Sequence, residues 1–413
     1  MERRRVVITG LGAVTPIGLT AMESWQAVKD GVCGVAPITQ FDPTGMKVQL
    51  AAEVKGFVPE NYMSKPEAKR MARFTQLAVV SAKEALENAG FTLDEAEADR
   101  CGVIVSSGIG GLFLTEAEHD KGKEKGWDRV SPFYIPMGIC NMAAGQIAIH
   151  TGFRGMCSCP VTACTGGTNA VGDAFHYIRD GYADVMLCGG TESAVTPLAI
   201  GAFTSMKALT QNPDPNRASI PFDAERSGFV LGEGAAILLL EELEHAKARG
   251  ARILAEVVGY GATCDAYHMT APRPDGSGAA KAMEMALADG GAKPEDVDYI
   301  NAHGTSTPLN DAGETAAVKT VFGDHAYKLA ISSTKSMTGH MLGAAGAVEA
   351  VFCAMALHDG YLPATINYQV PDPACDLDVV PGHGRSADVR YAMSNSLGFG
   401  GHNGSLLFKK WEA

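Results

Sequence analysis

Eight apolar runs, most of them bounded by glycine, recur along the chain at residues 5–12, 101–111, 184–190, 235–242, 253–261, 298–307, 329–336 and 391–401. Hydrophobic residues follow one another within these runs instead of alternating with polar residues. A continuous apolar run is typical of a strand that is covered on both faces, as in layered α/β proteins. The pattern therefore predicts buried strands.

Amphipathic stretches between several of these runs predict helices. The clearest covers residues 66–90, where Ser64 and Glu67 have the spacing of a capping box and Gly90 supplies a stop signal. The alternation of strands and helices predicts an α/β fold. A charged stretch at residues 116–130 predicts a surface excursion.

The order of the predicted elements is roughly doubled along the chain. One set lies within residues 1–251 and a second within residues 252–413, although their sequence similarity is too weak to prove a duplication. No linker rich in Pro, Gly or Ser separates the two sets. We therefore expect two similar halves in one structural unit.

Composition and charge narrow the possible functions. The net charge of −13 disfavours sequence-independent nucleic-acid binding, which needs a cationic surface. The longest apolar stretch, residues 341–357, contains Glu349 and is shorter than the roughly 20 residues of a membrane span. We expect a buried helix there and no membrane association.

The ten cysteines are spread over the chain without a secretory disulfide framework, which favours a reducing compartment, with the cytosol as the default. The glycines of residues 10–18 lack the dinucleotide-binding spacing, and no Gly-rich loop ends in Lys-Ser or Lys-Thr. We therefore expect no nucleotide cofactor.

Three cysteines fall within residues 155–175, GMCSCPVTACTGGTNAVGDAF. Cys157, Cys159 and Cys164 have no local fourth ligand and no second pair, as a structural zinc site would need, and they form no C-x-x-C redox pair. We interpret Cys157 and Cys159 as packing residues on a strand that leads to Cys164.

Cys164 directly precedes a predicted helix. The unpaired N–H groups and the dipole of a helix start are expected to lower the pKa of this thiol. The Cys164 N–H could itself donate to an oxyanion. Taken alone, such a cysteine is more often a small core residue than a nucleophile, so its partners decide between the two interpretations.

The second half contains the side chains that could make Cys164 reactive. His303 follows one predicted strand, and Lys335 and His340 follow the next. Catalytic groups gather at such strand ends in layered α/β proteins, although a single histidine there is more often structural. Glu349 would be costly to bury without a partner, for which Lys335 is the candidate.

A last glycine-rich turn, SNSLGFGGHNG at residues 394–404, surrounds Phe399 and could add N–H donors to an oxyanion hole. Together with VVITGLGAVTPIG, ERSGFVLGEGA, HGTSTPLND and KSMTGHMLGAAGAVE, it makes the whole chain resemble the elongating β-ketoacyl-acyl carrier protein synthases, closest to the synthase II type. The resemblance implies a thiolase-like α/β fold, with two similar halves layered α-β-α-β-α and mixed five-stranded sheets.

The resemblance also implies fatty-acid chain elongation by decarboxylative Claisen condensation. Cys164 would hold the acyl group as a thioester, and His303 and His340 would act in the decarboxylation of malonyl-acyl carrier protein. The products would be 3-oxoacyl-acyl carrier protein and CO2. Lys335 and Glu349 would be supporting charges.

Further roles are implied in the same way. The N–H groups of Cys164 and Phe399 would form the oxyanion hole, and Phe399 would gate the acyl pocket. Thr305 and Thr307 would hold the phosphopantetheine arm that carries the substrates, with no separate cofactor. The substrate pocket would also include Ile109, Phe203, Phe229 and Gly400. No metal is firmly implied, beyond a monovalent cation near Asn301, Glu349, Ser394 and Asn395.

The implied partners are an acyl carrier protein and a second copy of the chain in a homodimer, in which residues 131–149 would cover the partner's acyl pocket. Carrier proteins are acidic, so docking needs a basic surface on this acidic chain. Lys65, Lys69 and Arg73 are spaced i, i+4 and i+8 along the predicted helix, with Arg70 beside them, although an ordinary solvated face has the same pattern. The resemblance adds Lys207.

Two positions depart from the family pattern. Gly166 stands where a serine is frequent, and His402 replaces a usual threonine and places a third imidazole near the site. The alternative function is a polyketide-type ketosynthase subunit with the same chemistry. A thiolase is disfavoured because residues 394–404 contain no cysteine, and a starter-unit synthase is disfavoured by His340.

Overall fold

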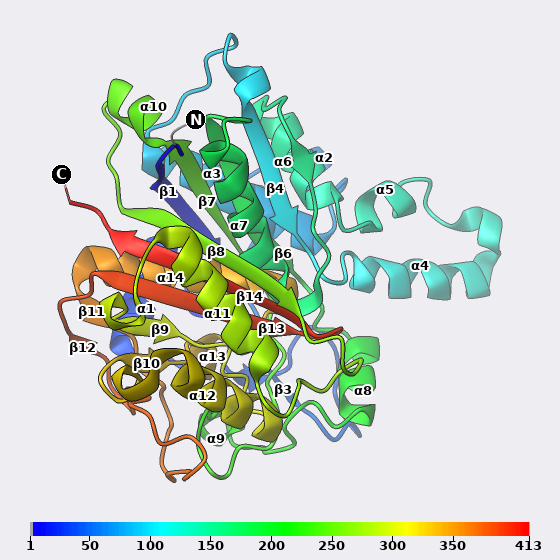
Figure 1. The fold of residues 1–413 in the computed structure, drawn as a ribbon. Helices are drawn as coiled ribbons and strands as arrows, with labels where there is room; N and C mark the ends of the chain where they lie inside the picture. The colour runs from blue at the N-terminus through cyan, green and yellow to red at the C-terminus, as the bar shows by residue number, and fades with distance from the viewer. Residues whose placement is uncertain (1–2, 413) are drawn as a thin grey trace.

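A ten-stranded mixed sheet runs through the computed structural model, which describes residues 3–412 (Figure 1). From edge to edge the strands are β10 (Ala330–Ser332), β9 (Tyr299–Asn301), β13 (Tyr391–Gly398), β14 (His402–Lys410), β8 (Ala255–Cys264), β1 (Val6–Val14), β7 (Gly234–Glu242), β6 (Val185–Glu192), β4 (Cys101–Ser106) and β5 (Cys157–Ser158). At the centre, β1 pairs antiparallel with β8 and joins the two halves.

The two halves repeat one topology. Outward from the centre, the first half has the order β1, β7, β6, β4, β5 and the second has the order β8, β14, β13, β9, β10. In both halves the two inner pairs are antiparallel and the two outer pairs are parallel. The predicted α/β architecture with two similar halves and mixed five-stranded sheets is confirmed, whereas the division at residue 251 stays a prediction.

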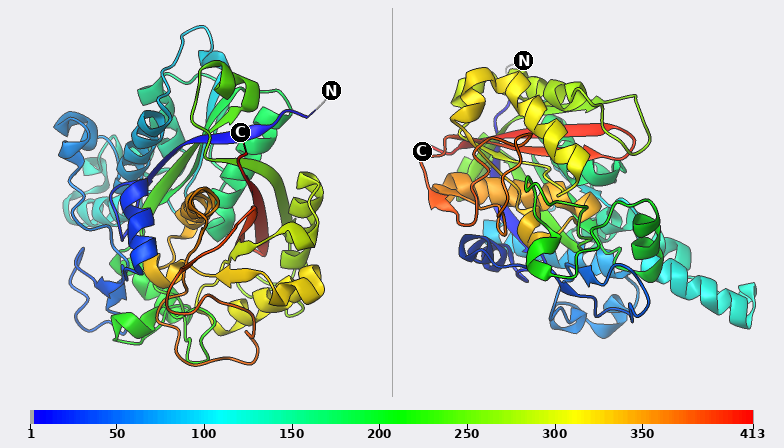
Figure 2. Two further views of the ribbon diagram at one scale, coloured as in Figure 1. Left: turned by 90° about the vertical axis from the view of Figure 1, so that its left-hand side faces the viewer. Right: turned by 90° about the horizontal axis from the view of Figure 1, so that it is seen from below.

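Helices lie in three layers around the two halves of the sheet (Figure 2). The outer layers are α3 (Arg73–Ala89) with α6 (Met142–Thr151) on the first half, and α11 (Ser277–Gly290) with α12 (Pro308–Phe322) on the second. Between the halves, α7 (Gly166–Arg179) packs against α14 (Ala345–Asp359). The layers therefore have the expected α-β-α-β-α order.

Further helices and two short strand pairs lie outside these layers. They are α1 (Ala21–Asp30), α2 (Lys65–Ala68), α4 (Leu112–Lys125), α5 (Tyr134–Gly138), α8 (Pro197–Ser205), α9 (Pro215–Ala218), α10 (Leu243–Ala248), α13 (Lys335–Thr338) and the strand pairs β2 (Ala36–Pro37) with β3 (Leu50–Ala51) and β11 (Tyr361–Leu362) with β12 (Arg385–Ser386). The predicted surface excursion lies in the projecting arm formed by α4 and α5 (Figure 1). The stretch Leu342–Asp359 has the length and composition of a membrane span, but 89% of it is buried inside the protein, as in a core helix.

Glycines on β1 allow α3 to lie directly on the sheet. A Cβ atom at Gly10 would stand 2.1 Å from the carbonyl oxygen of Ala85, and one at Gly12 would stand 1.9 Å from that of Ser81. Both distances are far below van der Waals contact, and the obstructing atoms are backbone. The glycines of this first strand therefore serve helix packing, in agreement with the absence of a nucleotide-binding spacing.

The second half uses the same device at the equivalent place. On β8, a Cβ atom at Gly259 would stand 2.1 Å from the carbonyl oxygen of Ala286, and one at Gly261 would stand 2.0 Å from that of Ala282, both on α11. The two halves therefore share a packing detail as well as a topology, which supports duplication more strongly than the sequence comparison of the halves does.

The single helix predicted over residues 66–90 is wrong in its first part. The capping box of Ser64 and Glu67 is present, but the helix that it starts, α2, ends at Ala68. The chain then turns, and α3 begins at Arg73 and ends at Ala89, followed by Gly90, whose φ of 58° makes it a left-handed C-cap. The spacing of basic residues across this break consequently does not place them on one helical face.

Replacing Gly12 or Gly261 with alanine is expected to destabilise the protein by about 1–3 kcal/mol or more, because each Cβ meets helix backbone that cannot move aside. Gly313 of α12 is the matched control, since a Cβ there meets nothing within 4 Å and its φ is ordinary. Gly313→Ala should stabilise the helix by about 0.5–1 kcal/mol. Urea unfolding of the three variants measures these differences, and equal effects at all three positions would contradict the packing account.

Candidate active site

Cys164 lies in a tight turn at the start of α7, where the first half of the protein meets the second. Its side chain is buried, and the residue before it, Ala163, has a left-handed φ of 51°. The position before the helix agrees with the sequence prediction. A Cβ at Gly166, the first residue of α7, would stand 2.0 Å from Ser106 Oγ, so a side chain there would require Ser106 to move.

The two histidines of the second half face each other beside this turn. His303 follows β9, and His340 lies between α13 and α14. Their ring centroids are 5.3 Å apart and the rings are nearly perpendicular, at 87°. Both side chains are buried, and the Nδ1 atom of each has no hydrogen-bond partner within residues 3–412.

Lys335 and Glu349 form a fully buried ion pair next to the histidines. The Lys335 ammonium donates to Glu349 Oε1, so the pairing predicted from the cost of burying Glu349 alone is present. Burial raises the pKa of Glu349 to about 7, and the Lys335 charge opposes that shift.

The imidazoles of His303 and His340 are neutral in this environment. Burial lowers the pKa of each well below its usual value, and the nearby Lys335 charge lowers it further. A neutral imidazole carries one N–H, so each ring can donate one hydrogen bond and accept another.

The expectation that the helix start lowers the pKa of Cys164 is wrong for the buried thiol. Loss of solvation raises the pKa of Cys164 to about 12, and this effect outweighs the opposing Lys335 charge. The N–H groups of Phe399 and of Cys164 itself also favour the thiolate, whereas the buried carboxylate of Glu192 disfavours it. The resting thiol is therefore protonated.

The turn between β13 and β14 brings the Phe399 N–H to the nucleophile. Gly400 and Gly401 in this turn have left-handed φ values of 87° and 78°. His402 packs its ring against Gly400, where a Cβ would stand 3.1 Å from the ring. Gly401 and Asn403, on either side of His402, line the active-site cavity, whereas His402 itself does not, so the third imidazole does not join the other two.

A cavity of about 570 Å³ opens onto these groups. Its wall contains the predicted site residues Cys164, His303, His340, Phe399, Thr305, Thr307, Ile109, Phe203, Phe229 and Lys207. Lys335 and Glu349 lie behind this wall, and Gly400 lies in the adjoining turn. Ile109, Phe203 and Phe229 pack with Cys164 in one apolar cluster, so the surroundings of the thiol are hydrophobic.

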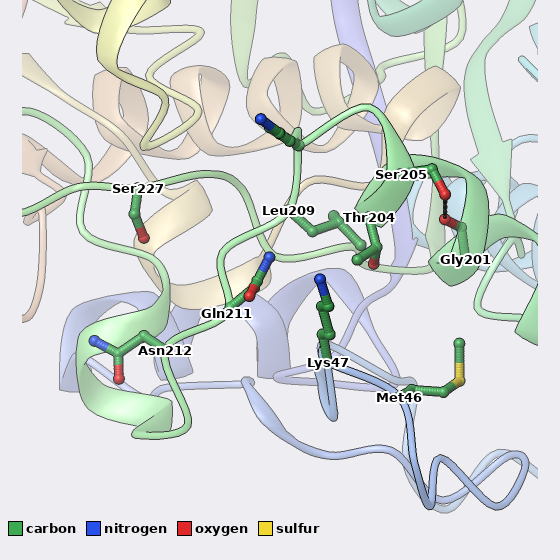
Figure 3. Close-up of a pocket in the computed structure, with 10 residues that line it drawn as sticks. Met46, Lys47, Gly201, Thr204, Ser205, Leu209, Gln211, Asn212 and Ser227 are labelled. Carbon is green, nitrogen blue, oxygen red and sulfur yellow. Dashed lines mark hydrogen bonds between the residues drawn. The ribbon is translucent and has the colours of Figure 1, made fainter.

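A second cavity, of about 800 Å³, adjoins the first and shares Lys207 with it. Its polar wall includes Lys47, whose side chain extends toward Gln211 (Figure 3). Lys47 and Lys207 are exposed and have no acidic partner within residues 3–412. Sequence reasoning did not find Lys47, because it belongs to no motif and reaches the cavity only through the fold.

The predicted docking residues are only partly brought together. Lys65, Lys69 and Arg70 are exposed around α2, with the Arg70 guanidinium 6.0 Å from the centroid of the Phe133 ring. The prediction that Arg73 belongs to the docking surface is wrong, because its guanidinium donates twice to the buried Glu233, at 2.8 Å each. Its positive charge is paired with the carboxylate of Glu233.

Cys157 and Cys159 take no part in this site. Cys157 is exposed on the edge strand β5, so its interpretation as a packing residue is wrong, and Cys159 is half-buried. Within residues 3–412, no three His, Cys, Asp or Glu side chains are grouped as metal ligands.

Comparisons with known proteins agree along the whole chain. Residues 3–246 match the family model of the beta-ketoacyl synthase N-terminal domain, and residues 254–369 match that of the C-terminal domain. The 3-oxoacyl-[acyl-carrier-protein] synthase 2 of Synechocystis sp. is 53% identical over 413 residues, covering 100% of this chain and 99% of the relative. That of Staphylococcus aureus is 51% identical over 412 residues and covers 100% of both chains.

A solved type II polyketide ketosynthase, bound to a hexaketide and in complex with its acyl-carrier protein, has the same fold. Its TM-score is 0.91 at 36% identity, covering 99% of this chain and 100% of that one. The thiolase-like fold implied by the sequence is confirmed.

Neither His303 nor His340 should become protonated near pH 6.5. The pKa of each histidine in the folded state lies below the unfolded value of about 6.5, so the unfolded state binds more protons than the folded state. The free energy of unfolding therefore falls as the pH drops below about 6.5. NMR of ¹⁵N-histidine-labelled protein measures the protonation state directly, with His303→Gln and His340→Gln assigning the signals and the exposed His383 as an internal comparison. A midpoint near 6.5 for either ring would contradict the desolvation account.

Proposed function

The chain belongs to the β-ketoacyl synthase family, and from this premise we propose how its residues divide the steps of a condensation. The protein is an acyltransferase of the 3-oxoacyl-acyl carrier protein synthase type, and it extends fatty acids by decarboxylative Claisen condensation. The observation that carries the site assignment is the meeting of Cys164, His303 and His340 in one cavity. The polyketide alternative fits less well, because the polyketide ketosynthase is 36% identical whereas the fatty-acid relatives exceed 50%.

In the first step, Cys164 takes the acyl group. Its sulfur attacks the carbonyl carbon of the acyl thioester, the carbon–sulfur bond to the carrier breaks, and the carrier thiol leaves with the proton that Cys164 gives up. The negative oxygen formed on the way is held by the N–H groups of Cys164 and Phe399, which already lie at the sulfur. The Lys335 charge offsets the cost of forming the thiolate in a buried site.

In the second step, the malonyl thioester loses CO2 and leaves an enolate. The enolate oxygen needs hydrogen-bond donors in a site without water, and the neutral imidazoles of His303 and His340 supply one N–H each. The enolate carbon then attacks the acyl-Cys164 carbonyl, the Cys164 thiolate leaves, and 3-oxoacyl-acyl carrier protein is released. Neutral donors suit this step, because they stabilise the enolate without protonating it as readily as an imidazolium would.

The substrate-holding residues follow from the same cavity. Thr305 Oγ1 and Thr307 Oγ1 lie 3.0 Å apart on the wall, where they can hydrogen-bond the amides of a phosphopantetheine arm. Ile109, Phe203 and Phe229 would enclose the acyl chain. The rings of Phe203 and Phe229 meet edge to face, with their centroids 5.4 Å apart. Phe399, in the glycine-rich turn, would gate the entrance.

The residues around Glu349 fit a monovalent cation. Glu349 Oε2 and Ser394 Oγ are buried without a hydrogen-bond partner in the described chain, and Asn301 and Asn395 are buried with them. Two unsatisfied oxygens beside buried amides are a donor set suited to a hard cation. Such an ion would supply positive charge that stabilises the second carboxylate oxygen of Glu349.

The partner would be an acidic acyl carrier protein, held by exposed cations around α2 and at the two cavities. Lys65, Lys69, Arg70, Lys47 and Lys207 are exposed and form no ion pair within residues 3–412, in a chain whose net charge is −13. Unpaired cations on an acidic protein are the surface that an acidic partner would select. The free cysteines are consistent with action in the cytoplasm.

A homodimer would cover the apolar surface of residues 131–149. Phe133, Ile135, Ile139 and Ile149 in this segment are exposed. The neighbouring strand β5 ends the sheet with an unpaired edge. Exposed apolar side chains next to a free strand edge are typical of a subunit interface.

Mixing the enzyme with acyl carrier protein that carries a long-chain acyl thioester should give an acyl adduct on Cys164. Intact-protein mass spectrometry would detect this adduct. Cys164→Ala should form none, because alanine has no nucleophile. Cys164→Gln should still release CO2 from malonyl-carrier protein, since decarboxylation depends on the histidines. An adduct that survives in Cys164→Ala would disprove the assignment of the nucleophile.

Charge reversal at the docking lysines should raise the Michaelis constant for carrier-bound substrate with little change in kcat. The Michaelis constant should rise by up to about fivefold in each variant, which corresponds to the roughly 1 kcal/mol that an exposed ion pair contributes, and its salt dependence should become flatter. The four variants are Lys47→Glu, Lys65→Glu, Lys69→Glu and Lys207→Glu. Lys328→Glu is the control, being exposed and outside both cavities. Kinetics equal to the control would remove a lysine from the docking surface.

A further inference from the structure

Glu192 is a fully buried carboxylate that the proposed reaction steps do not use. It ends β6, and four hydrogen-bond donors converge on it. Oε1 accepts from Ser107 Oγ at 3.0 Å and from the Ile109 N–H at 3.1 Å. Oε2 accepts from the Gly108 N–H at 2.8 Å and from the Gly343 N–H at 3.1 Å. All four partners donate to Glu192 and thereby favour its ionised form, which opposes the rise in its pKa that burial causes.

These donors come from two loops at the active-site cavity, one in each half of the protein. Gly108 and Ile109 follow β4 in the first half and line the cavity on the acyl side. Gly343 lies in the second half, three residues after His340, in the turn that starts α14. One carboxylate therefore ties the loop with the acyl pocket to the loop with a catalytic imidazole.

The two loops pack closely where each has a glycine. A Cβ at Gly343 would stand 2.6 Å from the Gly108 nitrogen, and one at Gly108 would stand 2.9 Å from Glu192 Oε2. Leu342, between His340 and Gly343, has a left-handed φ of 46°, a conformation that is costly for leucine and must be held by its surroundings. The Gly343 bond to Glu192 is placed to hold it.

We propose that Glu192 is a positioning residue that clamps the Ile109 loop and the His340 loop together and so places both relative to Cys164. It touches none of the reacting atoms and acts through backbone N–H groups. The inference depends on the proposed roles of Ile109 and His340 in the reaction.

Glu192→Gln should disturb the Ile109 loop and leave the His340 loop in place. A glutamine side chain has one acceptor oxygen, and its NH2 group must face two of the four former donors. Only Ser107 Oγ can also accept, so the amide NH2 should turn toward Ser107 and leave the oxygen on Gly108 and Gly343. The Ile109 N–H then loses its partner, while the His340 side of the clamp stays in place.

The test measures two rates in the full-length enzyme. Acylation of Cys164 by a long-chain acyl-carrier protein is followed by rapid quench and mass spectrometry, and CO2 release from malonyl-carrier protein is followed separately. Glu192→Gln should slow acylation about tenfold or more, because a misplaced acyl wall costs alignment at the reacting carbon. CO2 release should stay within about twofold of the wild type, because the histidines keep their positions.

Glu53→Gln is the matched control. Glu53 is also a buried carboxylate that accepts backbone N–H bonds, from Thr39 and Gln40, but it lies outside the cavity. Its replacement should lower the melting temperature without changing the ratio of the two rates. The same change of ratio in Glu53→Gln would overturn the proposal, and so would equal slowing of acylation and CO2 release in Glu192→Gln.

Ser107→Ala keeps the test decisive if Glu192→Gln does not fold. It removes a hydroxyl that donates to Glu192 and accepts from the Gly110 N–H at 3.1 Å, and it leaves the carboxylate on Ile109, Gly108 and Gly343. A smaller slowing of acylation, with CO2 release unchanged, supports the clamp, whereas a parallel loss of both rates overturns it. Failure of the proposed function itself would appear in the wild type as the absence of a Cys164 adduct.

Discussion

The active site depends on how closely the first turns of α7 and α14 approach each other. A Cβ at Gly167 of α7 would stand 2.7 Å from a backbone nitrogen of α14, and one at Gly346 of α14 would stand 2.1 Å from Thr168 Oγ1 of α7. Glycine on both helices is therefore a condition of the contact. Cys164 comes just before one helix and His340 just before the other, so this crossing brings the nucleophile of the first half to the imidazoles of the second.

The same crossing buries the site, and burial sets the protonation states on which the chemistry depends. Burial keeps the imidazoles of His303 and His340 neutral, so each ring carries one N–H donor. It also keeps the Cys164 thiol protonated at rest, although the N–H groups of Phe399 and of Cys164 itself favour the thiolate. The buried Lys335 supplies positive charge to all three groups, and Glu349 balances it. Burial of this one site therefore sets the protonation states of the thiol and of both imidazoles.

Sequence patterns predicted the parts of this arrangement that depend on local signals. Continuous apolar runs placed the strands, and residues at strand ends and at a helix start identified Cys164, His303 and His340. Features that depend on distant partners were not predictable in this way. Arg73 has the spacing of a surface cation, but Glu233, 160 residues further along, binds it. The pKa of Cys164 follows the local helix only until burial by the other half is added.

Duplicated topology with unlike chemistry explains why the two halves look so dissimilar in sequence. The loop after β9 carries His303, and the equivalent loop after β4 carries Ser107 and Ile109. The turn that ends β13 leads to Phe399, whereas β6 ends in Glu192. Each half therefore offers the same set of strand ends to the shared cavity, but one supplies the nucleophile and the walls while the other supplies the histidines and an oxyanion donor. Packing glycines on β1 and β8 are alike because both halves must fold in the same way, and the strand ends differ because the reaction needs two different sets of groups around one sulfur.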